Sequence, residues 1–97
     1  MTGLEFLLLA ALVGAVVVAI LRWADIQQWW YARKTNNYNI GIMIKKELSA
    51  GRVAVCTGVF DKSGDLKSSD VTSWKAEKLE YSVTSAFGGR KMARVTL

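Results

Sequence analysis

The chain begins with a run of apolar residues that differs sharply from everything after it. Between Leu4 and Leu21 the only charged residue is Glu5, and no proline interrupts the run. As a helix, this run would extend about 27 Å at roughly 1.5 Å per residue, close to the thickness of a bilayer's hydrocarbon core. It lacks the polar stripe that marks one side of a soluble helix. The pattern therefore predicts a transmembrane helix over residues 1–21.

A cleaved signal peptide is the competing interpretation of this run. No basic residue precedes it, and Arg22 and Trp23 follow it where small residues would mark a cleavage site. A retained anchor is therefore favoured. Because basic residues follow the run and none precedes it, we expect the N-terminus outside and the C-terminal domain in the cytoplasm. The single cysteine, Cys56, agrees with a reducing compartment.

Small residues recur within the apolar run at helical spacing. They are Ala11, Gly14, Ala15 and Ala19. Small side chains let helix backbones approach closely in a membrane, so we expect packing against other transmembrane helices or against a second copy of this chain. Lipid-facing filler is the alternative, because alanine is common in any membrane helix.

The segment after the run, residues 22–35, contains neither glycine nor proline, so the helix is predicted to continue to about Thr35. Apolar and aromatic side chains gather on it. They are Trp23, Ile26, Trp29, Trp30 and Tyr31. Three interpretations stay open for them: the lid of a small core, anchoring in lipid headgroups, or stacking on a ligand.

Residues 36–97 form the predicted domain, which starts with a hinge at its asparagines. Ile40, Ile44 and Leu48 lie four residues apart and predict a helix, although the alternation of isoleucines here also suits a strand. From Val53 to Phe60, β-branched residues alternate with other small and apolar ones, which predicts a strand with both faces covered.

The remaining chain predicts a turn, an edge strand, a helix and a final strand. The sequence from Asp61 to Asp65 is typical of a hairpin turn, and the polar segment after it suits an edge strand over about residues 66–71. Thr72 or Ser73 can cap a helix that ends at Gly88, and residues 91–97 predict a last strand. The fold class expected is therefore a single-pass membrane helix joined to a small α+β domain of about three antiparallel or mixed strands and two helices.

Positive charge is concentrated after the apolar run. Residues 22–97 carry all 13 Lys and Arg and seven of the eight Asp and Glu, a net charge of +6. Such a domain favours anionic lipid, nucleic-acid phosphates or an acidic protein, and charge alone does not choose among them. The candidate anion-binding residues are Arg52, Arg90, Lys91 and Arg94.

Catalytic and metal-binding chemistry finds little support in the sequence. The chain has no histidine, the commonest general base and transition-metal ligand. The turn from Asp61 resembles the start of a calcium loop, but the sixth and twelfth positions are Leu66 and Thr72 where an EF-hand needs Gly and Glu. Cys56 lies among valines, where a thiol is usually inert. We therefore expect no enzyme activity, no cofactor and no bound metal.

The opening MTGLEFLLLAALVGAVVVAIL is similar to the mature N-terminus of type IV pilins, in which a Glu at the fifth position begins an apolar helix. The resemblance covers about 21 residues and implies extracellular filament assembly, with Glu5 neutralising a neighbour's terminal amine. No bending proline and no leader peptide accompany it. The sequence as a whole predicts a non-catalytic membrane accessory or anchor subunit that packs by its helix and docks a basic domain on a partner. A membrane-tethered nucleotide or nucleic-acid binding module and a pilin-like subunit are the alternatives.

Overall fold

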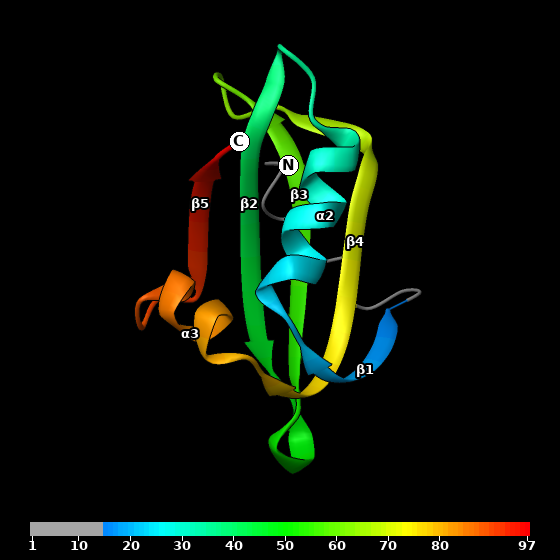
Figure 1. Cartoon of the computed structure of the whole chain (residues 1–97), viewed down its shortest axis with the longest axis vertical. Helices are drawn as coiled ribbons and strands as arrows, with labels where there is room; N and C mark the ends of the chain where they lie inside the picture. The colour runs from blue at the N-terminus through cyan, green and yellow to red at the C-terminus, as the bar shows by residue number, and fades with distance from the viewer. Residues whose placement is uncertain (1–14) are drawn as a thin grey trace.

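The computed structural model describes residues 15–97, and within this range it describes all side chains except those of residues 68–70. The elements are β1 (Val16–Leu21), α2 (Trp23–Arg33), β2 (Tyr38–Glu47), a 3-10 turn η1 (Ser49–Gly51), β3 (Val53–Asp61), β4 (Leu66–Leu79), α3 (Tyr81–Phe87) and β5 (Met92–Thr96). The described strands form one five-stranded sheet in the order β1-β4-β3-β2-β5. β1 is parallel to β4 and every other pair is antiparallel. Helices α2 and α3 lie over the same face of this sheet (Figure 1).

The end of the apolar run is a strand and not part of a helix. Val16–Leu21 pairs in parallel with the last six residues of β4, from Trp74 to Leu79. Valine and isoleucine lose side-chain freedom in a helix and fit a pleated sheet well, and β4 offers the backbone partner that this conformation needs. The fold class predicted from the sequence is therefore wrong: the described chain is a mixed sheet with two short helices.

The membrane anchor predicted from the sequence is not supported either. Among residues 15–97, no helix combines the length and the apolar character needed to cross a bilayer. A single-pass protein with its N-terminus outside and its C-terminal domain in the cytoplasm is thus not supported, and neither is packing between membrane helices. Of the small residues assigned to that packing, Ala11 and Gly14 lie outside the described residues, Ala15 precedes β1, and Ala19 is exposed within it.

Helix α2 begins anew at Trp23 and does not continue from the apolar run. Arg22 has an extended backbone (φ −97°, ψ 149°), and its N–H donates to the Asp25 carboxylate at 3.2 Å. This bond occupies a donor at the helix start, where backbone N–H groups lack helical partners. The helix ends at Arg33, within the range the sequence predicted for it.

Two further helix predictions are corrected by the sheet. Tyr38–Glu47 is strand β2, which settles the ambiguity of its isoleucines in favour of the period-two pattern. The helix predicted from Thr72 exists only over Tyr81–Phe87, because β4 runs on to Leu79. Strand β1 pairs only with the second half of β4, from Trp74 to Leu79, so the polar start of β4 has β3 alone beside it among the described strands, as expected for the edge strand predicted over about residues 66–71.

The predictions for β3 and the turn after it are confirmed. β3 spans Val53–Asp61, and the turn that follows has Gly64 at φ +88°. The Asp61 side chain accepts hydrogen bonds from the backbone N–H groups of Ser63 and Asp65, at 2.9 and 2.8 Å. Both hydrogen bonds to the carboxylate lie within the turn, so Asp61 stabilises the turn locally.

The two faces of the sheet carry separate apolar clusters. On the helix face, Trp30 and Ile26 of α2 pack with Val83 and Phe87 of α3, all essentially fully buried. The opposite face holds a smaller cluster of Ile40, Ile42, Cys56 and Phe60. The helix-face cluster fixes α3 against the sheet, and so fixes where the chain turns into β5.

Candidate functional site

The turn between α3 and β5 brings two basic residues to the edge of the sheet. Gly88 ends α3 in the left-handed conformation (φ 59°, ψ 36°), and Gly89 also has a positive φ of 78°. These values are accessible to glycine at little cost. The Arg90 N–H then donates to the carbonyl of Phe87 at 3.0 Å, which closes the reversal. Arg90 and Lys91 therefore lie immediately before β5.

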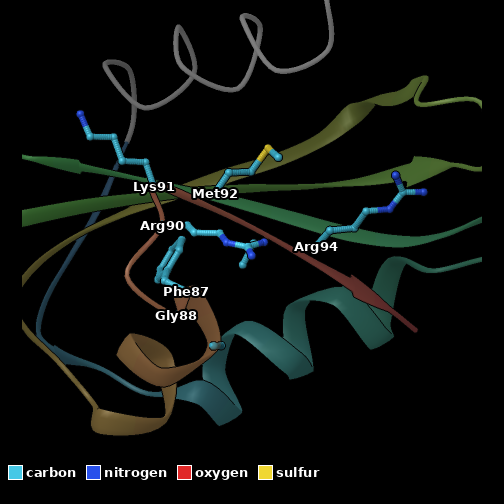
Figure 2. Close-up of a pocket in the computed structure, with 8 residues that line it drawn as sticks. Phe87, Gly88, Arg90, Lys91, Met92 and Arg94 are labelled. Carbon is cyan, nitrogen blue, oxygen red and sulfur yellow. The ribbon is translucent and has the colours of Figure 1, made fainter.

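Strand β5 adds Arg94 on the face of the sheet that carries no described helix. Met92 pairs with Ile44 of β2 and Arg94 pairs with Ile42, so these side chains share that face. Lys91, Met92 and Arg94 extend away from Phe87 and α3 (Figure 2). Arg94 is exposed, and 42% of the Met92 surface is accessible.

The neighbouring strand supplies two more cations. The Lys45 N–H donates to the Lys91 carbonyl at 2.9 Å, which ties the end of β2 to the start of β5. The Lys45 ammonium lies 5.2 Å from the centre of the Phe87 ring, a cation–π contact that holds it beside α3. Lys46 follows and is exposed.

We refer to these five residues as the basic edge. They are Lys45, Lys46, Arg90, Lys91 and Arg94. Two shallow depressions are lined by them together with neighbouring residues, among which Glu47 is the one acid. Among the side chains that the structure describes, no carboxylate forms an ion pair with any of the five.

The structure brings together three of the four residues that the sequence proposed for anion binding. Arg90, Lys91 and Arg94 belong to the basic edge, whereas Arg52 lies in the hairpin beyond the end of β2, where its carbonyl accepts from the Leu48 N–H at 2.8 Å. Lys45 and Lys46 were missed. They lie at this edge only because β2 pairs with β5. The sequence pattern predicted a helix over those residues, so that pairing was not expected.

The aromatic segment contributes mainly to the hydrophobic core. Ile26 and Trp30 are fully buried, and Trp23 packs edge-on against Trp30 with ring centres 5.7 Å apart. This arrangement matches the interpretation of the segment as the lid of a core. Trp29 and Tyr31 are less buried than Trp30. The Arg33 guanidinium lies 4.5 Å from the centre of the Trp29 ring, and the Lys34 ammonium lies 4.8 Å from the centre of the Tyr31 ring.

The chemistry open to this arrangement is electrostatic binding. Burial raises the pKa of the Cys56 thiol to about 11, so it stays protonated and poorly nucleophilic near neutral pH. The described residues contain no group of His, Cys, Asp or Glu that could hold a metal ion. What they do assemble is a set of five cations on two neighbouring strands and one turn, four of them exposed and Lys45 half-buried.

No family model, curated protein or solved structure matches this chain.

Proposed function

We propose that this chain is a non-catalytic binding module that docks on an anionic partner through its basic edge. The observation that supports it is the convergence of five cations from β2, β5 and the α3–β5 turn around two depressions. The single acid there, Glu47, pairs with none of them in the described residues. Charge of one sign gathered on one edge attracts and orients an oppositely charged partner.

The strength expected from such a surface is modest. Each exposed ion pair contributes about 0.2–1 kcal/mol, and salt screens it beyond a Debye length of about 10 Å at 0.1 M. Five cations acting together would therefore give binding that depends steeply on ionic strength. Steering raises the rate of association more than it raises the final affinity.

A phosphate-bearing ligand is the second candidate, supported by the grouping of Arg90, Lys91 and Arg94. Single-stranded nucleic acid usually also binds by stacking its bases on exposed aromatic rings. Among the described residues, the exposed aromatic side chains are Tyr31 and Tyr81, and neither lines the depressions of the basic edge. The surface thus offers charge without stacking, which favours an acidic protein partner.

A charge-reversal pair tests this function. Binding of the full chain to poly-glutamate and to a single-stranded oligonucleotide is measured at stepped salt concentrations. Arg94→Glu should weaken binding about tenfold, on the order of 1.4 kcal/mol. Lys78→Glu is the matched control, because it makes the same change in net charge on the far side of the sheet, on β4, where exposed Lys78 pairs with Ile20 of the edge strand β1. Equal effects of the two variants, or binding that salt does not weaken, would show that the basic edge is not the docking surface.

A further inference from the structure

We infer that the anionic partner is an acidic protein segment that binds in extended form, as an added strand along the outer edge of β5. The inference rests on the proposed function and goes beyond it, because it specifies how the partner's backbone is held. Strand addition of this kind takes its affinity from main-chain hydrogen bonds and its selectivity from alternate side chains.

Among residues 15–97, no strand pairs with the outer side of the β5 backbone. β5 is the last strand of the sheet and pairs only with β2 among the described strands. The Lys91 carbonyl accepts from Lys45, and the Leu97 N–H donates to the carbonyl of Asn39 at 2.8 Å. In an antiparallel pair the residues that bond to the neighbour alternate, so residues 91, 93, 95 and 97 face β2.

The residues between them therefore direct their main-chain groups outward. These residues are Met92, Arg94 and Thr96. No residue in the range 15–97 forms a backbone hydrogen bond with them on that side. They present three N–H and three C=O groups in a row, which is the template that an extended peptide needs.

Side-chain charge indicates which peptide fits. An added strand would place alternate side chains beside Arg94 on the open face of the sheet and beside Ala93 and Val95 on the helix face. Acidic residues on the open face of the peptide would meet Arg94, whereas basic residues there would meet like charge, and apolar residues on the other face would meet Ala93 and Val95. The basic edge and the unoccupied backbone coincide, so one ligand can use both.

A second copy of this chain fits the same edge poorly. If two β5 strands paired antiparallel about their centres, Arg94 of each would lie opposite Arg94 of the other, and like charges directly opposite destabilise a sheet. The other edge, β1, is different: its residues from Val16 to Leu21 are uncharged, and Val17 is 75% exposed. Charge complementarity therefore specifies an occupant at β5 and none at β1.

Backbone methylation of the ligand separates strand addition from simple charge attraction. The probe is a fluorescent hexapeptide of alternating Glu and Val, compared with the same peptide N-methylated at every residue, which keeps its charges and loses its N–H donors. We expect the full chain to bind the methylated peptide at least tenfold more weakly. Binding of the unmethylated peptide should also slow hydrogen exchange at the amides of Met92, Arg94 and Thr96.

A protein variant provides the complementary test. Thr96→Pro removes an N–H that faces outward and changes no charge, and proline is tolerated on an edge strand in that orientation. With the fold checked by circular dichroism, it should weaken peptide binding while leaving its salt dependence unchanged. Equal binding of both peptides would overturn strand addition and leave the basic edge standing. Insensitivity of both peptides to Arg94→Glu would remove the proposed function itself. If the oligonucleotide alone bound at this edge, the partner would be a nucleic acid and this inference would be wrong.

Discussion

Replacing Gly41 with alanine tests how tightly Trp30 is held against the sheet. A Cβ at position 41 would lie 2.6, 2.7 and 3.0 Å from Cε2, Cδ2 and Cζ2 of the Trp30 indole. The ring has little room to move away. It is fully buried, and its Nε1 donates at 2.7 Å to the hydroxyl of Thr57, which in turn donates at 2.7 Å to the carbonyl of Ile42.

The expected cost follows from these contacts. Overpacking a filled core site costs about 1–3 kcal/mol, so Gly41→Ala should lower the free energy of unfolding by that amount. Trp30→Ala should cost about 3–5 kcal/mol for the lost packing, and about 0.5–1.5 kcal/mol more for the lost hydrogen bond. With the indole removed, nothing opposes the new methyl group. Gly41→Ala should then be close to neutral, which gives a coupling energy of about 1–3 kcal/mol.

Urea unfolding followed by circular dichroism measures all four members of this cycle. If Trp30→Ala alone does not unfold cooperatively, Trp30→Leu serves as the background, because leucine also vacates the space over Gly41. The reasoning is refuted if Gly41→Ala costs the same with and without the indole. That result would mean that the penalty arises in the backbone of β2 and not from contact with Trp30.

Three further predictions concern single groups. Thr57→Val keeps the shape of the side chain but leaves the Trp30 N–H and the Ile42 carbonyl without this partner, so urea unfolding should show a loss of about 1–3 kcal/mol. The pKa of Cys56 is raised from 9.0 to about 11 by burial, so the folded state favours the neutral thiol. Its stabilising contribution is complete below pH 9 and is lost as the pH rises towards 11, and iodoacetamide at pH 8 should react much faster in denaturant than with the native chain; equal rates would contradict burial. Gly88→Ala places a Cβ at φ 59° without a steric clash, so thermal unfolding should report only the backbone strain, about 1 kcal/mol.

Elements with strong local signals could be predicted from the sequence. The strand from Val53 alternates regularly, and the Asp61–Asp65 turn combines a glycine with side chains that cap their own backbone. The aromatic helix over residues 23–33 lacks any helix breaker. In each case the information lies within a few residues, so the local interpretation and the tertiary structure agree.

Elements with ambiguous periodicity were decided by pairing that the sequence does not show. Ile40, Ile42 and Ile44 satisfy both a strand and a helix pattern in part, and β2 is a strand because β3 and β5 flank it on both sides. The β-branched run at Val16 was assigned to a membrane helix on its hydropathy alone. Its partner, the second half of β4, lies more than fifty residues away in the chain, where a helix was expected.

The residues of the candidate site were likewise predicted only in part from the sequence. Arg90, Lys91 and Arg94 are close in sequence, so their grouping was predicted. Lys45 joins them through a hydrogen bond across two strands, from its N–H to the Lys91 carbonyl. That contact depends on register, and shifting a strand by one residue would turn its side chains to the other face. Arg52 was grouped with them by charge only, and the hairpin carries it elsewhere.

The position of β5 in the sheet relates its charge to the proposed function. An exposed strand edge is a hazard in any β protein, because it can pair with another copy, and charged residues on the edge are a common remedy. On that basis alone Arg94 would be sufficient protection for a five-residue strand. Lys45 and Lys91 add charge beside an edge that is already protected, and no described carboxylate neutralises them. Under the proposed function, this surplus would make the edge repel its own copies and attract acidic chains, so one feature would both prevent self-pairing and select the partner.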